Sequence, residues 1–287
     1  MKRVGTPIVI KADGLAAGKG VTVAMDAETA NHAIDEAMVD GVFGAAGNQV
    51  VIEGYLDGEE ASILAFSDGK TSSQDHKPAY DGDKGPNTGG MGAYSPAPVV
   101  TDALMAEIQA RVLQPCIDGM AAEGSPYVGV LYAGLMITAN GPEVVEFNCR
   151  FGDPETQVVL PRLTSDLVEI AQACCTGTLD QIELSYTPEA SATIVLASEG
   201  YPSSYPKGRL ITGIDAAEAD GTALVFHAGT KTTDEGLVTS GGRVLAVTAL
   251  GDTLQETLDR AYAGVAKISF EGVQYRTDIG QKAFKHL

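Results

Sequence analysis

Two apolar segments, residues 128–138 and 143–149, flank an Asn-Gly pair at 140–141 and constrain the fold more than any other feature. Asn-Gly is a strong signal for a two-residue hairpin turn, because both residue types tolerate positive φ. The segments are therefore predicted to form two antiparallel strands. Side chains alternate across a strand, so Glu146 and Asn148 are expected on one face and the apolar side chains between them on the other.

A carboxylate and an amide oxygen on one face of a strand can share a cation. Mg²⁺ and Mn²⁺ suit such oxygen ligands, and Mg²⁺ usually completes its shell with waters and substrate phosphates. Glu146 and Asn148 are thus a candidate metal site for nucleotide chemistry. The alternative is a half-exposed edge strand with two solvated polar residues. This segment alone leaves both interpretations open.

Composition narrows the class of protein. The chain has 287 residues, of which 44% are hydrophobic, and no apolar run approaches the about 20 residues of a membrane helix. A globular protein of two domains is expected. The net charge of −19 argues against nucleic-acid or anionic-membrane partners, since no basic stripe is present. The four cysteines show no CxxC pair and are expected as free thiols, and no secretory signal pattern follows Met1, so we expect a cytoplasmic protein.

Periodicity predicts a mixed α/β organisation. Strands are expected at 8–10, 21–24, 50–52 (buried) and 61–66, and helices at 26–38, capped by Asp26, and at 101–117. Residues 68–98 show little regular pattern and are expected to be a long structureless loop, which is usually either functional or disordered. Beyond the hairpin, Ser165 is expected to cap a helix and the domain boundary to lie near 177–188. Strands at 192–197, 223–227 and 243–249 and a helix at 253–268, with Asp252 as N-cap, complete the expected elements.

The loop at residues 11–20 is rich in glycine. Gly14, Gly18 and Gly20 would expose backbone N–H groups to phosphate oxygens, while Lys11 and Lys19 would supply positive charge. The spacing excludes a Walker A loop, and no GxGxxG is present. A flexible hairpin turn is the alternative.

Two further segments carry weaker signals. Residues 53–60 leave a strand and enter an acidic turn, which suits either an adenine and ribose contact or a solvated turn. His76, between Asp75 and Lys77, precedes a Gly-rich turn at 85–92 and is a candidate proton-transfer group. A lone histidine is more often structural or solvated.

Four motifs in order resemble the phosphoribosylamine–glycine ligase family, also called glycinamide ribonucleotide synthetases, which are ATP-grasp enzymes of purine biosynthesis. They read Lys-Ala-Asp-Gly-Leu-Ala-Ala-Gly-Lys-Gly, Ser-Gln-Asp-His-Lys, Gly-Pro-Asn-Thr-Gly-Gly-Met-Gly-Ala-Tyr-Ser-Pro and Glu-Phe-Asn-Cys-Arg-Phe-Gly-Asp-Pro-Glu-Thr-Gln. The resemblance extends from about Pro7 to the C-terminus. It includes the segments His227 to Lys231, Ser240 to Arg243 and Tyr275 to Gly280.

The resemblance implies ATP bound between two α+β subdomains. The loop at 11–20 would lie on the phosphates, Glu53 and Leu56 at the adenine, and Glu59 near the ribose. The implied ATP-binding residues are Lys11, Gly14, Gly18, Lys19, Gly20, Glu53, Leu56 and Glu59.

The resemblance also implies the chemistry. Glycine would be phosphorylated by ATP to glycyl phosphate, which the amine of 5-phosphoribosylamine would then attack. Glu146 and Asn148 would bind Mg²⁺ or Mn²⁺, and Lys19 and Arg150 would act as catalytic residues that stabilise the transferring phosphoryl group. The implied substrate-binding residues are Asp75, His76, Lys77, Asn87, Thr88, Gly89, Arg150, Asp153 and Glu155.

The expected fold class is α+β, an ATP-grasp fold followed by a small, mainly β C-terminal domain. The ATP-grasp domain would span 1–185, with a small lid subdomain at 1–55 and a larger one at 56–185, and the C-terminal domain 190–287. Family members carry a preceding domain, so the chain is expected to be truncated at its N-terminus. A monomer is expected.

Two positions depart from the family pattern. Gly54 stands where an acidic residue is common and Pro78 where Arg is common, which affects the adenine contact and the substrate loop. Three alternatives stay open: another ATP-grasp ligase, a nucleotide-binding fragment without turnover, and a fragment that does not fold stably.

Overall fold

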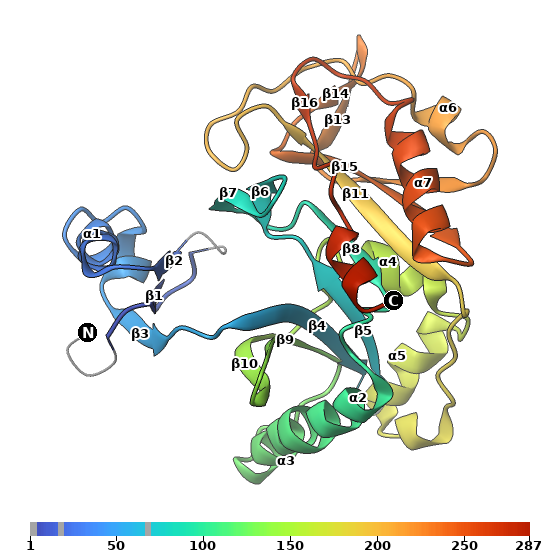
Figure 1. The fold of residues 1–287 in the computed structure, drawn as a ribbon. Helices are drawn as coiled ribbons and strands as arrows, with labels where there is room; N and C mark the ends of the chain where they lie inside the picture. The colour runs from blue at the N-terminus through green and yellow to red at the C-terminus, as the bar shows by residue number, and fades with distance from the viewer. Residues whose placement is uncertain (1–4, 17–19, 67–69) are drawn as a thin grey trace. The chain divides into compact units, whose positions relative to one another are not determined.

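The computed structural model describes residues 5–16, 20–66 and 70–287, with the side chains of residues 70 and 71 left aside (Figure 1). The chain forms two compact units. The smaller consists of Met1–Asp57 with Asn87–Gly89, and the larger of Gly58–Pro86 with Gly90–Leu287.

The smaller unit is a three-stranded antiparallel sheet with one helix. The strand order is β2-β1-β3, with β1 at Ile8–Ala12, β2 at Val21–Ala24 and β3 at Val50–Gly54. Helix α1 (Ala27–Met38) begins at Asp26, whose Oδ1 accepts from the Thr29 N–H at 2.7 Å, as predicted for an N-cap. A short 3₁₀ turn, η1 (Gly44–Gly47), leads into β3.

Helix α1 covers only one face of this sheet. Ile8 and Ile10 lie on that face and pack with Ala30 and Ala33 of the helix. The predicted strand at 50–52 exists, but the prediction that it is buried was wrong. Because β3 is an edge strand of a sheet with one open face, Val51 and Ile52 are 40% and 38% exposed.

The larger unit is built on one nine-stranded sheet in the order β10-β9-β4-β5-β8-β11-β15-β12, with β16 paired to β11. Every pairing in it is antiparallel. The strands in chain order are β4 (Gly58–Phe66), β5 (Lys70–Asp75), β8 (Gly92–Ser95), β9 (Val130–Thr138), β10 (Gly141–Asn148), β11 (Ala190–Ser198), β12 (Ala223–His227), β15 (Arg243–Gly251) and β16 (Val273–Gln274).

The prediction that residues 68–98 form a structureless loop was wrong. The segment contains β5 and β8 of the main sheet and a two-stranded ribbon of β6 (Pro78–Tyr80) and β7 (Lys84–Asn87). Strands β5 and β8 are hard to predict because several of their buried side chains are polar. Ser95 Oγ, for example, donates to the Ser72 carbonyl at 2.6 Å. Buried polar groups with partners inside a sheet remove the apolar alternation on which strand prediction depends.

The predicted hairpin is confirmed by β9 and β10, although its turn lies one residue earlier than expected. Thr138 pairs with Gly141, so residues 139 and 140 form the loop. Gly141, at φ 102°, provides the positive φ. A register shift between Val144 and Glu146 places one extra residue in β10.

Helices cover both faces of the first half of this sheet. On one face lie α2 (Asp102–Ile108), the π-helical turn η2 (Gln109–Leu113) and α3 (Gln114–Ala122), which pack Ile108, Val112 and Leu113 onto β4 and β9. On the other lie α4 (Thr156–Val159), η3 (Leu160–Arg162), α5 (Leu167–Thr176) and η4 (Leu179–Gln181). Helix α5 is capped by Asp166 rather than by Ser165: Asp166 Oδ1 accepts from the Val168 N–H at 2.7 Å.

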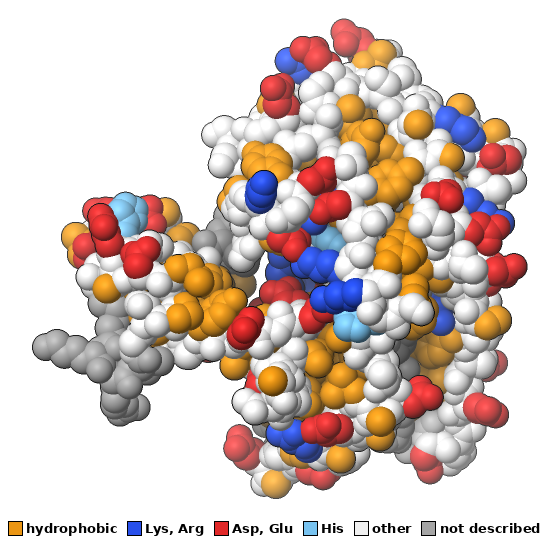
Figure 2. Space-filling model, in the orientation of Figure 1, with side chains coloured by type: hydrophobic (Ala, Val, Ile, Leu, Met, Phe, Trp, Pro, Cys, Tyr) orange, Lys and Arg blue, Asp and Glu red, His pale blue; other side chains and the backbone are white. Residues whose placement is uncertain are grey.

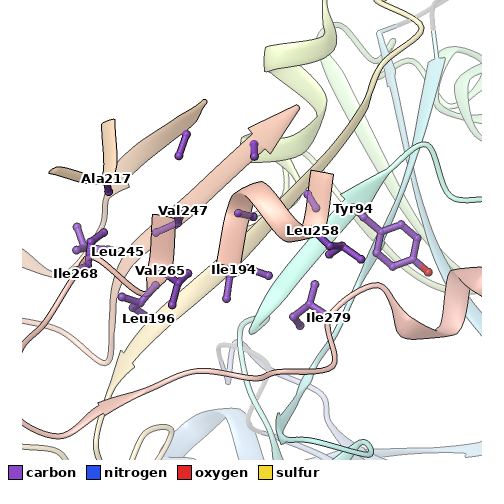
Figure 3. Close-up of a cluster of buried hydrophobic side chains, with 14 of the residues drawn as sticks. Tyr94, Ile194, Leu196, Ala217, Leu245, Val247, Leu258, Val265, Ile268 and Ile279 are labelled. Atoms are coloured by element: carbon purple, nitrogen blue, oxygen red, sulfur yellow. The ribbon is translucent and has the colours of Figure 1, made fainter. Parts of the chain in front are cut away.

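The C-terminal third packs around β11 and β15. Helix α7 (Leu254–Val265) presents Leu258 and Val265 to a core that includes Ile194, Leu196 and Val247 (Figure 3). The remaining elements are α6 (Ile214–Glu218), β13 (Thr230–Thr233), β14 (Gly236–Thr239) and η5 (Gln281–Lys285).

The capping box of α7 lies one residue later than predicted. Thr253, not Asp252, is the N-cap, and its Oγ1 accepts from the Glu256 N–H at 3.2 Å. The Glu256 carboxylate accepts in return from the Asp252 N–H at 3.1 Å.

Candidate functional site

The open face of the small sheet combines apolar side chains with a cation. In antiparallel pairs, directly opposite residues share a face, and the register pairs Lys11 with Val51, and Val9 with both Val23 and Glu53. Lys11 Nζ lies 2.6 Å from Glu53 Oε2 on this face. Hydrophobic side chains gather on the exposed surface of the unit (Figure 2). Such a surface can accept a flat apolar ring and an anion.

The Gly-rich loop is partly used for internal packing. The Gly14 N–H donates to the Ala46 carbonyl at 3.0 Å, and a Cβ at this position would lie 2.6 Å from Ala46 Cα. The Gly14 amide is therefore not available to a phosphate, contrary to the prediction. A Cβ on Gly20 would lie 2.8 Å from Ala16 Cβ, so packing also requires this glycine. Gly18 and Lys19 lie outside the described residues.

Leu56 is half-buried in the connection after β3. Glu59, on β4, lies among groups that the sequence did not predict. Its carboxylate forms ion pairs with Lys285 and His286, the latter at 3.2 Å, and accepts from Gln74 Nε2 at 3.1 Å. Burial by itself raises the pKa of Glu59, but Lys285 and the other donors hold it below its ordinary value.

The second candidate surface is one face of the large sheet. The register pairs Ser62 with Gly134, which in turn pairs with Glu146. Tyr132 pairs with Asn148 and lies on this same face. The opposite face carries the apolar core beneath α2 and α3. The sheet thus presents a polar face, defined here by Glu60, Ser62, Asp75, Tyr132, Glu146 and Asn148.

Glu155, from the segment before α4, is buried against this polar face. Its Oε1 accepts from the Tyr132 hydroxyl at 2.9 Å and from Ser62 Oγ at 3.2 Å. The two hydroxyls lie 2.8 Å apart. Gly152 makes room for this carboxylate, since a Cβ there would lie 2.3 Å from Glu155 Oε2.

Asp75 and Lys77 extend the network. Burial, together with the nearby Glu155 carboxylate, raises the pKa of Asp75 well above its ordinary value, and Asp75 Oδ1 is buried without a hydrogen-bond partner among the described residues. Burial alone lowers the pKa of Lys77, but the Glu60 carboxylate, 3.4 Å from its Nζ, and other negative groups raise it well above the ordinary value. The structure therefore brings Asp75, Lys77 and Glu155 together, as the resemblance implied.

Glu146, Asn148 and Arg150 form an accessible cluster on the polar face. Asn148 Nδ2 donates to Glu146 Oε1 at 3.1 Å, and Arg150 Nη2 donates to Asn148 Oδ1 at 3.3 Å. The Arg150 guanidinium lies 5.9 Å from the centroid of the Tyr132 ring. The two oxygen-bearing side chains fit a divalent cation that keeps waters and binds substrate phosphates. Within the described residues no group of three His, Cys, Asp or Glu side chains forms a fuller metal cage.

His76 does not lie on the polar face. Its ring is 2% exposed, and its Nε2 accepts from the Gly280 N–H at 3.4 Å. Burial and the nearby Arg276 lower the pKa of His76 to about 4. The prediction that His76 contacts substrate is therefore not supported, since the ring is enclosed by the C-terminal segment. Of the remaining predicted substrate residues, Asn87 and Gly89 are exposed and Thr88 is buried.

Asp153 is exposed and forms an ion pair with Arg243 at 3.1 Å. It borders a cavity of about 510 Å³ lined by Gly152, Asp153, Thr156, Gln157, Leu160, Pro161, Phe226 and His227. The C-terminal region therefore reaches the segment that carries Asp153 and Glu155.

Two family models match most of the chain. Residues 1–156 match the phosphoribosylglycinamide synthetase ATP-grasp (A) domain, and residues 191–282 match the C domain of the same synthetase. The chain belongs to the phosphoribosylglycinamide synthetase family. This membership confirms the predicted ATP-grasp fold class.

Members of this family from distant organisms are similar over nearly the whole chain. A Vibrio cholerae protein named phosphoribosylamine–glycine ligase is 53% identical over 289 residues, which is 99% of this chain and 67% of that protein. An Agrobacterium fabrum protein of the same name is 55% identical over 284 residues, 97% of this chain and 66% of that protein. The chicken trifunctional purine biosynthetic protein adenosine-3 is 54% identical over 98% of this chain and 28% of its own length.

Solved structures agree with the fold. The Thermotoga maritima phosphoribosylamine–glycine ligase matches with a TM-score of 0.81 and 35% identity, over 97% of this chain and 70% of that one. A Hydrogenobacter thermophilus biotin carboxylase domain matches with a TM-score of 0.64 at 14% identity, over 96% of this chain and 59% of that one, and shows the fold alone. No helix in the described part of the chain combines the length and hydropathy that a membrane crossing requires.

Several site residues were missed from the sequence. Ser62 interrupts the apolar run of the predicted strand at 61–66, and Glu60 lies two residues before it, so both residues carried a local signal. Tyr132 gave no local signal, because its role depends on a segment distant in sequence. Arg243 lies in the segment Ser240 to Arg243 of the resemblance, but its contact with Asp153 could not be predicted.

Proposed function

We propose that the chain catalyses the ATP-dependent ligation of glycine to 5-phosphoribosylamine, giving glycinamide ribonucleotide, ADP and phosphate. The names of the family members at 53% and 55% identity support this reaction. The observation that carries the proposal is the cluster of Glu146, Asn148 and Arg150 on the polar face, beside the buried Glu155 network. Two metal ligands, Glu146 and Asn148, beside the positively charged Arg150 side chain suit phosphoryl transfer to a carboxylate.

In this proposal the carboxylate of glycine attacks the γ-phosphate of ATP, and the amine of phosphoribosylamine then displaces phosphate from glycyl phosphate. Glu146 and Asn148 would hold a divalent cation, which supplies positive charge to the phosphates. Arg150, exposed above the Tyr132 ring, binds the transferring phosphoryl group and the acyl phosphate. The residues of the chain thus act by positioning and electrostatics, without a covalent enzyme intermediate.

The other residue roles are proposals of the same kind. Lys11 and Lys19 bind ATP phosphates, Glu53 and Leu56 the adenine, and Glu59 the ribose. Release of the Lys285 and His286 ion pairs would free the Glu59 carboxylate for this contact. Asp75, Asp153, Glu155 and Asn87 orient the amino- and hydroxyl-bearing substrates.

The finer assignments concern the cation, the assembly and the domains. We propose Mg²⁺ or Mn²⁺ as the cation, a monomer, a cytoplasmic location, and domains at 1–185 and 190–287. The C-domain family model begins beside this boundary, at residue 191, whereas the ATP-grasp model ends earlier, at residue 156.

The test is product formation with each reactant omitted in turn. We expect ADP and phosphate release that requires glycine, phosphoribosylamine and a divalent cation together, with the amide product detected by mass. Glu146→Ala is expected to abolish turnover, whereas Glu143→Ala, on the same strand nearer the turn, is expected to leave it within about 2-fold.

Two outcomes would contradict the proposal. Turnover unaffected by Glu146→Ala would refute the metal assignment, and an amide product only with a different acid or amine would refute the substrates. ATP binding by calorimetry without product would instead assign a nucleotide-binding role. The chain spans about two thirds of the length of these bacterial relatives.

A further inference from the structure

Arg243, the first residue of β15, connects the C-terminal region to two motif segments of the proposed active site. Its Nη1 donates to the Asp153 carbonyl at 2.8 Å and its Nη2 to Asp153 Oδ2 at 3.1 Å. Nη1 also lies 3.4 Å from the carbonyl of Gly90, in the Gly-Gly-Met-Gly motif. The guanidinium therefore contacts the backbone of both segments and one carboxylate.

The two segments that Arg243 contacts are packed against each other without spare room. Gly90 has a φ of +114°, and a Cβ there would lie 2.3 Å from Pro154 Cδ and 2.6 Å from Asp75 Oδ1. The residue after Pro154 is Glu155, which accepts hydrogen bonds from the polar face. A shift of either segment would thus move Asp75 or Glu155 directly.

The contact geometry favours a guanidinium specifically. Arginine presents a planar fork that can donate in parallel to a carbonyl and a carboxylate, whereas the lysine ammonium is a single point charge. The side chain of Arg243 is 21% exposed and that of Asp153 is 54% exposed. An ion pair this exposed typically adds only about 0.2–1 kcal/mol to stability. The ion pair therefore contributes little to the stability of the fold. Its main effect is to hold the two segments in a fixed geometry.

We propose that Arg243 is a positioning residue for the ligation reaction, which fixes the Gly90 and Asp153 segments and thereby the orientation of Asp75 and Glu155. The kinetic part of this proposal rests on the proposed function. Arg243 does not touch the reacting atoms. It sets the place at which the amine substrate meets the acyl phosphate.

The matched control is Arg260 on α7. Its Nη1 donates to the Leu250 carbonyl at 2.6 Å and its Nη2 to Glu256 Oε1 at 2.5 Å, so it makes the same kinds of bond away from the motif segments. We expect Arg243→Met to lower kcat/KM for phosphoribosylamine about 100-fold, the loss typical of a misplacement of about 1 Å, with the KM for ATP changed less than about 2-fold. Arg243→Lys should recover little of the lost kcat/KM. The kcat/KM of Arg260→Met should match that of the wild type.

A second readout does not depend on turnover. In hydrogen exchange of the protein without substrates, Arg243→Met should accelerate exchange in peptides covering residues 89–92 and 152–157, relative to both wild type and Arg260→Met. Thermal melting of the Arg243 and Arg260 variants should agree within a few degrees.

The outcomes separate this proposal from the proposed function. A wild-type chain without turnover refutes the activity, while the exchange comparison still decides the role of Arg243. Unchanged exchange in Arg243→Met, or full kinetic rescue by Arg243→Lys, overturns the positioning role. Equal kinetic loss in Arg260→Met would show a general structural effect and overturn it as well.

Discussion

The open face of the small sheet and the polar face of the large sheet both carry charged residues, yet they are built in opposite ways. On the small sheet, the side chains of Lys11 and Glu53 are 20% and 43% exposed and lie beside exposed valines. On the large sheet, Glu155 is buried and its hydrogen bonds come from hydroxyls that lie against it. The Lys11–Glu53 pair is partly exposed, whereas the Glu155 network is enclosed and oriented.

This difference separates two kinds of contribution. Exposed ion pairs add little to stability, so residues such as Lys11 can change partners at low cost when a ligand arrives. Buried polar networks fix side-chain orientation, but removal of one member leaves another unsatisfied. Substitutions in the buried Glu155 network should therefore affect orientation and stability together, and those on the open face mainly ligand binding.

After Glu146→Ala, Arg150→Met should produce the largest effect on turnover, because Arg150 is the exposed cation on the polar face. We expect kcat to fall about 100- to 1000-fold, the usual loss when one donor to a developing charge is removed. Stability should change little, since the guanidinium lies on the surface of the Tyr132 ring. The measurement is steady-state ADP release together with urea unfolding.

Arg111→Met is the control for the loss of a positive charge. Arg111 pairs with Glu107 on the surface helices and lies on the apolar side of the sheet, away from the polar face. A similar loss of kcat in Arg111→Met would show that net charge, rather than the position of Arg150, matters.

The next largest effect is expected from His76→Gln, and it is a change in how stability depends on pH. Because burial and Arg276 lower its pKa to about 4, the folded protein favours the neutral ring. The unfolded chain binds a proton near pH 6.5, so the stability that His76 contributes is present above that pH and is lost as pH falls toward 4. The shift from 6.5 to about 4 corresponds to about 3 kcal/mol.

We therefore expect wild-type stability to decrease between pH 7 and pH 4 by about 3 kcal/mol more than that of His76→Gln. Urea unfolding at several pH values measures the difference. His32, exposed on α1, is the control, and His32→Gln should follow the wild-type pH dependence. Parallel curves for His76→Gln and wild type would contradict the buried position of His76.

Much of the fold could be predicted because local rules determine it. The strand at 21–24, the Asp26 cap and the β9–β10 hairpin follow from periodicity, capping chemistry and turn residues that lie within a few positions of one another. The strands of residues 70–95 could not be predicted in the same way. In β5 and β8 several buried side chains are polar, with partners on the neighbouring strand, and the side chains of β7 are exposed, so no local pattern marks these strands.

The same limit applies to the candidate site. Glu146, Asn148 and Arg150 are close in sequence, and strand alternation placed the first two on one face correctly. Arg243 and the ion pairs of Glu59 with Lys285 and His286 join segments far apart in the chain. The Gly14 prediction was wrong because a glycine also serves close packing, here against Ala46, and sequence does not distinguish the two uses.

Glu155→Ala tests the buried side of the comparison through stability. The Tyr132 and Ser62 hydroxyls can still bond to each other, but one donor loses its acceptor. A buried unsatisfied donor costs about 1–3 kcal/mol, so we expect a loss of about 2 kcal/mol in urea unfolding. Glu169→Ala, at an exposed site on α5, should cost well under about 1 kcal/mol. Equal losses in both variants would show that the network does not stabilise the fold.

Glu53→Gln tests the exposed side and should have the smallest effect on stability. The Lys11–Glu53 pair is partly solvated, so its removal should cost less than about 1 kcal/mol, and less still at high salt. ATP affinity, measured by calorimetry, should fall, because Glu53 lies on the face proposed to bind the nucleotide. Glu36→Gln on α1 is the control and should leave ATP affinity unchanged. A loss of stability as large as that of Glu155→Ala would remove the distinction between the two faces, since it would make the open face as tightly organised as the buried one.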